Sequence, residues 1–415
     1  MQQTRATSGA GIVEHKTAFT PVIHPDTFSF ATALFLKLAY TYDGRDLPTQ
    51  IVESNAAGTV ATVTFEYDNR GRLIGESRVA AQGVTTPEYE MDYVYDQMGN
   101  RLKKWDYGRD RLTEYVYDVE DPSTYGSDNN RLQFYTVSDI SGQTPVLEST
   151  SWYYYDANGN PTRIVTELDA SPDAFTAVRF VYDKGRRVAA VAGESWTAAG
   201  ACTGQPPQPN DYQRLYVREF RYEYDEPRAK YLTVERDCDT SSTVLARTWT
   251  DYLGGSVYGD YEVTRSGGGI PVYTELVSFL PGIGSITLGN VTTVKYDHSD
   301  DLGTLRALSD DGGDDLGAAV YTAFGERIDG PNHRYGYVGA AGYRAHEDFA
   351  CDEQADPYPF PYLHLGWRYY DPAGGRFLQR DPIGIGGGFN VYAYVMNRPT
   401  RGADPLGLGP EKVSG

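Results

Sequence analysis

Apolar and aromatic residues alternate with polar ones along most of the chain, in short runs that end at aspartate and glycine. Tyr93 and Tyr95 stand two positions apart, so both side chains project from one face of an extended strand. Asp96 follows and can accept hydrogen bonds from backbone amides two residues on, while Gly99 supplies the positive φ of a reversal. An Arg-Leu pair then begins the returning strand, so each such phrase predicts one β-hairpin.

This Tyr-x-Tyr-Asp phrase is an internal repeat. The aspartates of its copies are Asp43, Asp68, Asp96, Asp118, Asp156, Asp183 and Asp225, with a late, degenerate copy at Asp297. A lone hairpin cannot bury its apolar face, so the copies are expected to stack into one continuous sheet. The alternative is a series of unrelated hairpins in an ordinary sandwich, which the number of shared phrases disfavours.

The composition agrees with an all-β fold. Tyr, which favours strands, occurs 35 times against 15 Phe. The 45 Gly and 23 Pro residues disfavour long helices. The net charge of −20 would repel phosphate backbones and anionic membrane surfaces, so nucleic acid is not expected as a partner. The most apolar segment, residues 28–40, is too short to cross a membrane, and no transmembrane segment is expected.

The three cysteines do not make a disulfide framework. Cys202 and Cys238 lie in comparable loop-like stretches and either pair or stay as thiols, with Cys351 left over in both cases. The N-terminus lacks the features of an ordinary signal peptide. Export would therefore need a specialised route, or a leader absent from this chain.

Three other patterns carry little chemistry. The glycine run at 384–388 lacks the Lys-Ser/Thr of a phosphate loop and predicts a flexible loop. The acidic residues at 310–315 do not have the spacing of a standard calcium loop and predict a solvated hairpin tip. The six histidines are dispersed, without a zinc motif. No metal or cofactor is expected.

Tyr-Asp repeats with this spelling resemble those of RHS (YD-repeat) proteins, the bacterial polymorphic-toxin shells that include the C components of insecticidal toxin complexes. The resemblance covers about residues 38–408. It is most specific in the C-terminal segment, which resembles the RHS repeat-associated core at residues 296–307, 321–326, 335–339, 367–384, 390–399 and 404–408. The resemblance implies one long sheet spiralling into a hollow shell, partial here, with a C-terminal core plug.

These observations divide the chain into four parts. Residues 1–37 are expected to form an N-terminal arm and the first strands, and residues 38–290 the repeat sheet. The core domain is expected over 291–408, followed by a stub at 409–415.

The C-terminal segment also contains three Asp-Pro pairs, beginning at Asp371, Asp381 and Asp404. Asp-Pro is a common turn starter, and this structural interpretation is preferred for Asp371 because it repeats the Tyr-Asp phrase. Asp381 and Asp404 are the better chemical candidates. Two carboxylates held close together cannot both ionise easily, so one can act as general base on water while the other polarises a peptide carbonyl. Arg368 can orient a carboxylate or stabilise an oxyanion.

The family resemblance points to the same residues. RHS cores of this kind act as an aspartyl self-protease that cuts after the Asp-Pro-x-Gly-Leu phrase. Carried onto this chain, that implicates Arg368, Asp381 and Asp404, with the scissile bond between Leu408 and Gly409. The alternative is a core that serves only as a structural plug.

Two functions follow from the sequence. The first is a secreted or cell-surface toxin-encapsulating and delivery scaffold whose only enzymatic act is a single self-cleavage. Its effector would be absent, because only seven residues follow Leu408. Its partners would be that C-terminal effector polypeptide and a secretion apparatus or second shell subunit. The second is a non-catalytic surface or wall-associated protein whose aromatic strands bind, for example, carbohydrate.

Overall fold

The computed structural model describes residues 2–8, 11–23, 30–81, 88–117, 130–169, 174–197, 212–222, 231–236, 244–253, 256–265, 269–280, 282–289, 291–330, 333–346 and 359–412. Side chains are described from residue 36 onward, except those of 231–236, 245, 253, 256 and 412. The question of a Cys202–Cys238 pair falls outside these residues, as do Cys351 and the repeat aspartates Asp118 and Asp225.

Within the described chain, 23 strands form one antiparallel sheet in which each strand pairs with the next in sequence. The first half comprises β1 (Gln2–Ser8), β2 (Gly11–Ile23), β3 (Phe30–Tyr42), β4 (Pro48–Asn55), β5 (Gly58–Tyr67), β6 (Leu73–Ala80), β7 (Tyr89–Tyr95), β8 (Arg101–Asp106), β9 (Arg111–Tyr117), β10 (Leu132–Asp139), β11 (Val146–Tyr155) and β12 (Pro161–Leu168). The second comprises β13 (Ala174–Tyr182), β14 (Val188–Thr197), β15 (Gln213–Arg221), β16 (Tyr231–Arg236), β17 (Val244–Leu253), β18 (Ser256–Arg265), β19 (Pro271–Leu280), β20 (Gly284–Thr287), β21 (Thr293–Ser299), β22 (Leu305–Asp310) and β23 (Asp315–Ala318). The predicted all-β fold of stacked hairpins is confirmed.

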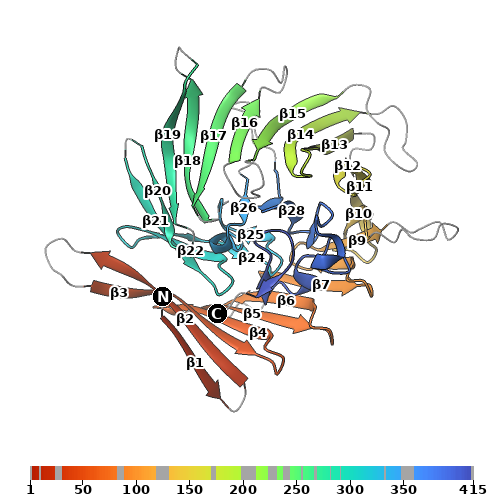
Figure 1. The fold of residues 1–415 in the computed structure, drawn as a ribbon. Coiled ribbons are helices and arrows are strands. Elements are labelled where there is room, and N and C mark those ends of the chain that lie inside the picture. Colours follow the sequence, from red (N-terminus) through yellow and green to blue (C-terminus); the bar gives the residue numbers. More distant parts are fainter. Residues whose placement is uncertain are drawn as a thin grey trace.

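The sheet curls around the C-terminal segment, drawn in blue in Figure 1, and no pairing among the described residues joins β1 to β23. The enclosed segment holds short elements: β24 (Val320–Tyr321), β25 (Arg327–Asp329), β26 (Arg344–Ala345), β27 (Leu363–Leu365), β28 (Arg368–Asp371), β29 (Arg376–Phe377), β30 (Gly402–Ala403), β31 (Glu411–Lys412), and the 3-10 turns η1 (Gly339–Ala341), η2 (Gly384–Gly387) and η3 (Val395–Asn397). The architecture is thus an open, curved sheet around a small core.

One turn, which we call the Asp turn, closes the repeat hairpins. At Asp68, carboxylate Oδ1 accepts the backbone N–H groups of Arg70 and Arg72, each at 2.9 Å, and Gly71 takes a φ of 76°. The Asp turn recurs, with the same bond from the amide four residues on and a positive φ three residues on, at Asp43, Asp96, Asp156, Asp183, Asp300 and Asp310. The predicted carboxylate-to-amide bonds are therefore confirmed.

The repeated tyrosines tie one hairpin to an earlier one. The hydroxyl of Tyr67 donates to the carbonyl of Pro48 at 2.7 Å, and that of Tyr182 donates to Pro161 at the same distance. Equivalent bonds run from Tyr117, Tyr155 and Tyr222 to the backbone carbonyls of Arg101, Leu132 and Val188. Phenylalanine has no hydroxyl group and cannot donate this hydrogen bond. The bond therefore explains why tyrosine is preferred over phenylalanine at these repeat positions.

One predicted copy of the repeat is wrong in position. Asp297 lies inside β21 and does not begin a turn, and burial raises its pKa to about 6. The chain reverses at Asp300, whose Oδ1 accepts the N–H of Leu302 and Thr304. Strands β21 to β23 also continue the sheet by pairing onward from β20, so the sheet extends past the expected domain boundary at residue 290.

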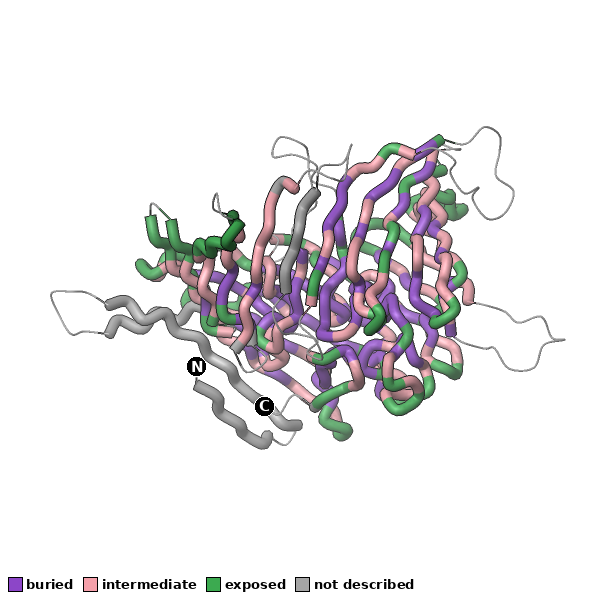
Figure 2. The backbone as a smooth tube through the Cα atoms, turned by 45° about the horizontal axis from the view of Figure 1, so that its top comes forward, coloured by how far each residue is buried: buried purple, intermediate pink, exposed green. Residues whose placement is uncertain are grey.

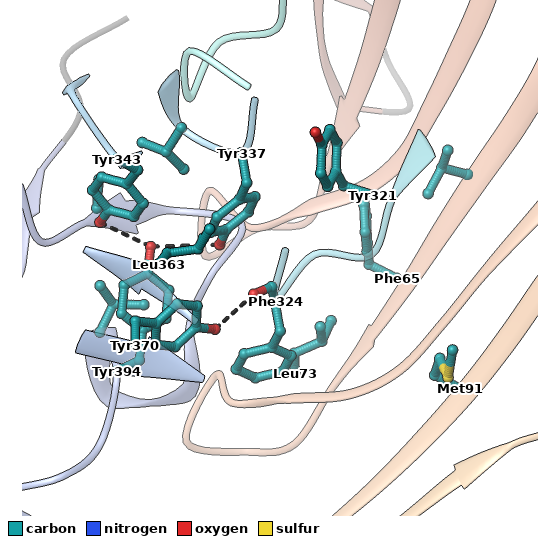
Figure 3. Close-up of a cluster of buried hydrophobic side chains, with 14 of the residues drawn as sticks. Phe65, Leu73, Met91, Tyr321, Phe324, Tyr337, Tyr343, Leu363, Tyr370 and Tyr394 are labelled. Atoms are coloured by element: carbon teal, nitrogen blue, oxygen red, sulfur yellow. Dashed lines mark hydrogen bonds between the residues drawn. The ribbon is translucent and has the colours of Figure 1, made fainter. Parts of the chain in front are cut away.

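The main hydrophobic core lies between strands β3–β7 and the enclosed segment (Figure 3), and Figure 2 marks in purple where the backbone carries buried residues. Tyr370 donates to the carbonyl of Phe324 at 2.6 Å, and the hydroxyls of Tyr343 and Tyr394 lie 3.0 Å apart. From the sheet, the core receives apolar side chains such as Leu73. Buried tyrosines satisfy their hydroxyls here, so the core combines packing with fixed orientation.

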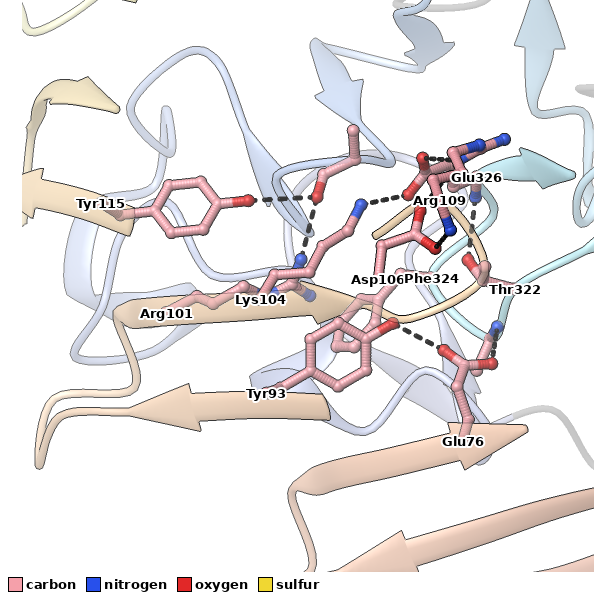
Figure 4. A network of polar contacts seen from close by, with 12 residues as sticks. Glu76, Tyr93, Arg101, Lys104, Asp106, Arg109, Tyr115, Thr322, Phe324 and Glu326 are labelled. Atoms are coloured by element: carbon pink, nitrogen blue, oxygen red, sulfur yellow. Dashed lines mark hydrogen bonds and ion pairs between the residues drawn. The ribbon is translucent and has the colours of Figure 1, made fainter. Parts of the chain in front are cut away.

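A buried polar network fixes the enclosed segment to β6–β9 (Figure 4). Both oxygens of Glu76 are used: one accepts the Tyr93 hydroxyl and the other the N–H of Ala323, each at 2.7 Å. Lys104 pairs with Glu326. Because Glu76 and Lys104 are buried, their charged groups need these partners, and the contacts hold the segment in place against the strands.

The C-terminal residues also cap the row of Asp turns. Contacts run from this stretch to the backbone of successive repeats: Arg401 to Arg45, Arg398 to Arg70, Asn397 to Gly99 and Tyr392 to Gly159. Residues near the end of the chain therefore meet turns from four hairpins at one rim of the sheet.

Replacing a turn carboxylate should weaken the fold without disturbing the apolar core. For Asp68→Ala we expect the free energy of unfolding to fall by about 1–2 kcal/mol, because backbone amides and the Arg72 guanidinium lose their acceptor. Urea unfolding followed by fluorescence measures this change. Asp311→Ala, at an exposed position, is the control and should change stability by less than about 0.5 kcal/mol. Equal effects of the two variants would contradict a stabilising role for the Asp turn.

Candidate active site

Arg368 is the centre of the candidate site. It begins β28 beneath the C-terminal turn, is 2% exposed, and places its guanidinium 3.5 Å from the centre of the Phe377 ring. Its Nε donates to the carbonyl of Gly407 at 2.6 Å and its Nη1 to that of Val391 at 3.1 Å. The remaining nitrogen, Nη2, is free to hold carboxylates.

Nη2 of Arg368 contacts two of them. It lies 3.0 Å from Oδ2 of Asp381 and 3.2 Å from Oδ2 of Asp404. Both aspartates are buried. The three side chains that the sequence singled out therefore meet around one nitrogen atom.

Asp404 sits in a variant of the Asp turn. Its Oδ1 accepts the N–H of Leu408, four residues on, at 2.9 Å, and Gly407 takes a φ of 65°. In the repeats, Oδ2 is occupied by a side chain, as by Arg72 at Asp68 or Arg187 at Asp183. At Asp404, Oδ2 accepts the N–H of Gly409 at 3.0 Å in addition to the Arg368 guanidinium. The turn thus directs a carboxylate oxygen onto the nitrogen of the Leu408–Gly409 peptide bond.

Asp381 approaches the same peptide bond from another side. Its Oδ1 accepts the N–H of Ile383 at 2.9 Å, and its own N–H donates to Val391 at 3.0 Å, which fixes its position. A Cβ added to Gly387 would meet both the Asp381 carboxylate and the carbonyl oxygen of Leu408, so these two groups are neighbours. The peptide bond lies between two carboxyl groups, one near its nitrogen and one near its oxygen.

Burial and charge act in opposite directions at this site. Burial raises the pKa of both Asp381 and Asp404, while the Arg368 guanidinium lowers them. Asp381 raises the pKa of Asp404 further, and burial lowers the pKa of Arg368. Two carboxylates beside one guanidinium leave an excess negative charge in a buried site, which a single shared proton removes. The arrangement can therefore supply one general acid and one general base.

The third Asp-Pro pair lies elsewhere. Asp371 ends β28 and turns the chain toward β29, with its carbonyl accepting the N–H of Gly375 at 2.8 Å. Burial raises its pKa, opposed by a bond from the Gly374 N–H. Its place at a hairpin turn agrees with the structural interpretation.

Several supporting groups were not found from sequence. The hydroxyl of Tyr343 accepts the N–H of Asp404, and the carbonyl of Val391 holds Arg368. Neither position has a sequence signal, because each acts through folding of distant segments. Gly407 had one: it stands three residues after an aspartate, as the glycines of the Asp turns do.

Among the described residues, no group of three or more His, Cys, Asp or Glu side chains is arranged to hold a metal ion. The acidic stretch after Asp310 forms the tip of the β22–β23 hairpin, as predicted. Within the same residues, no helix is long and apolar enough to cross a membrane.

Comparison with known proteins gives relatives but no matching family model. The chain is 25% identical to toxin protein Tse5 of Pseudomonas aeruginosa, over 89% of this chain and 27% of Tse5. It is 23% identical to toxin subunit YenC1 of Yersinia entomophaga, over 91% of this chain and 43% of YenC1. A 42-residue stretch is 62% identical to the probable deoxyribonuclease RhsB of Dickeya dadantii, covering 10% of this chain and 3% of RhsB.

The chain therefore spans less than half the length of each of these relatives. Among solved structures it superposes on the TcdB2–TccC3 complex with a TM-score of 0.40 and 15% identity, over 95% of this chain and 21% of that one. Its Tyr-Asp hairpins, its single long sheet and its toxin relatives agree with the resemblance to RHS (YD-repeat) proteins that the sequence predicted.

Proposed function

We propose that this chain is part of an RHS-type toxin-delivery scaffold whose core cuts its own backbone between Leu408 and Gly409. The observation that carries the proposal is the contact of Asp404 with that peptide bond. One of its oxygens accepts the N–H of Leu408 and the other that of Gly409, with Arg368 and Asp381 alongside.

The hydrogen bonds favour different roles for the two carboxyl groups. Asp404 accepts two backbone N–H groups and Arg368 Nη2, three donors that stabilise its ionised form. Asp381 accepts one backbone N–H besides Arg368. Asp381 is therefore the better holder of the shared proton and Asp404 the better base.

Cleavage then follows the chemistry of paired carboxyl groups. Asp404 takes a proton from a water molecule as the water oxygen bonds to the carbonyl carbon of Leu408, while Asp381 donates its proton to the carbonyl oxygen. Asp404 passes the proton it gained to the nitrogen of Gly409, and the C–N bond breaks. The proton on the former carbonyl oxygen returns to Asp381, which leaves a carboxyl group at Leu408 and an amine at Gly409.

Arg368 acts by positioning in this scheme. Two of its nitrogens are occupied by backbone carbonyls, of Gly407 and Val391, and the third holds both carboxylates. Its buried charge keeps one carboxyl group ionised without leaving the site strongly negative.

The wider role follows from the relatives. Tse5 is named a toxin and YenC1 a toxin subunit, and each is longer than this chain. We infer that the curved sheet encloses a toxic polypeptide that follows Gly409 in the complete protein, outside the producing cell or on its surface. Self-cleavage would free that cargo from covalent attachment while the sheet still surrounds it. A second shell subunit or a secretion apparatus would be the further partner.

Substituting either carboxyl group should stop cleavage. The chain is extended after Gly415 with a folded reporter domain, and release of the reporter is followed on denaturing gels. Asp381→Asn and Asp404→Asn should each lower the cleavage rate at least about 100-fold, since each removes a proton-transfer group. Asp371→Asn, in the other buried Asp-Pro pair, is the matched control and should cleave normally. An intact unmutated chain would leave the core as a structural plug.

Cleavage should also depend on pH in a bell-shaped way. The active pair carries one proton, so the rate falls at low pH when both groups are protonated and at high pH when both are ionised. Because burial raises both pKa values above 3.8, the low-pH limb should lie above pH 3.8. Reporter release measured between about pH 3 and pH 9 covers both limbs. A rate independent of pH across this range would contradict the paired-carboxyl mechanism.

A further inference from the structure

The glycine run at 384–388, which the sequence presents as a flexible loop, lies against the candidate cleavage site. Its 3-10 turn η2 follows directly from Asp381, and the N–H of Gly384 donates to the Asp381 carbonyl at 3.0 Å. A Cβ on Gly409 would stand 3.7 Å from Cα of Gly387. The loop therefore forms one wall of the space around the Leu408–Gly409 bond.

We propose that Gly387 is a positioning residue of the self-cleaving site, whose missing side chain lets the Leu408 carbonyl stand beside Asp381. This inference rests on the proposed function. A Cβ at Gly387 would overlap Oδ2 of Asp381, and would stand 3.2 Å from its Cγ and 3.0 Å from the Leu408 carbonyl oxygen. Each distance is shorter than an ordinary van der Waals contact of a methyl group.

Space, and not backbone conformation, requires glycine at this position. Gly384 and Gly388 take φ values of 62° and 143°, where other residues are strained. Gly387 has no such φ, so its φ does not by itself require glycine. The nearest atoms to a methyl group at 387 all belong to the two groups of the proposed reaction, the Asp381 carboxyl group and the Leu408 carbonyl.

The neighbouring glycine supplies a matched control. A Cβ on Gly386 would meet nothing closer than Cδ1 of Ile383, at 3.8 Å, an ordinary contact, and its φ is also unrestricted. The loop is open to solvent, with Ile385 73% and Phe389 84% exposed. A methyl group on either glycine therefore leaves the hydrophobic core untouched.

A methyl group at 387 has two predicted effects. It must push the Asp381 carboxylate, the Leu408 carbonyl, or both out of their present positions. Separation of Asp381 from Arg368 removes the charge that lowers the pKa of this carboxyl group, so Asp381 should hold its proton to higher pH. The first effect lowers the cleavage rate, and the second moves the pH profile.

The test compares Gly387→Ala with Gly386→Ala in the full chain carrying the reporter domain after residue 415. We expect Gly386→Ala to release the reporter within about twofold of the unmutated rate, and Gly387→Ala to be slower by about 100-fold, the size of effect caused by an ångström-scale misplacement of reacting groups. The residual cleavage of Gly387→Ala should have its high-pH limb shifted to higher pH. Both variants should melt within about 2 °C of the unmutated protein.

The outcomes separate this inference from the proposed function. If the unmutated chain does not cleave, the proposed function fails and the inference fails with it. If the unmutated chain cleaves and the two alanine variants are equally fast, only the role of Gly387 is overturned. A slow Gly387→Ala with an unshifted pH profile, or with a melting temperature well below that of Gly386→Ala, would assign the effect to folding and also overturn it.

Discussion

A carboxylate that accepts the amide hydrogens of its own turn is the interaction on which this structure depends. Each Asp turn reverses the chain after a strand, and places a positive φ three residues on and an acceptor for the amide four residues on. Without it, the part-buried amide four residues on would lose its acceptor in hairpin after hairpin. Because the same turn is repeated, the 23 strands of the described residues form one sheet in which each strand pairs with its neighbour in sequence.

The same interaction connects the sheet to its core. The Asp turns stand in a row at one rim, and the arginines and asparagines near the C-terminus contact their backbone carbonyls. At Asp404 the turn appears again, and there Oδ2 accepts a backbone amide, that of Gly409, besides the Arg368 guanidinium. The turn at Asp404 thus differs from those of the repeats by the backbone amide that one carboxylate oxygen accepts. Arg368 and the burial of the site supply the remaining electrostatic conditions.

Much of this was accessible from sequence because the repeat is local. Tyr-x-Tyr-Asp followed by glycine specifies strand, turn and return within about ten residues, so fold class and turn chemistry could be predicted. Asp297 shows the limit: it has the spelling of a repeat but lies within β21, because the true reversal at Asp300 satisfies more amides. The grouping of Arg368, Asp381 and Asp404 was suggested by their family motif, whereas the contribution of Tyr343 depends on tertiary packing and leaves no local pattern. The proposed role of Gly387 could not be predicted from the sequence for the same reason, since its neighbours Asp381 and Leu408 meet only in three dimensions.

The most direct test of the account concerns the origin of the oxygen at the new carboxyl terminus. The chain with its C-terminal reporter is unfolded, refolded in water enriched in 18O, and the fragments are analysed by mass spectrometry. Attack by water between the two carboxyl groups predicts a single 18O atom in the carboxyl group of Leu408 and a free amine at Gly409. An unlabelled Leu408 terminus, a break between Asp404 and Pro405, or a chain that stays intact would contradict it.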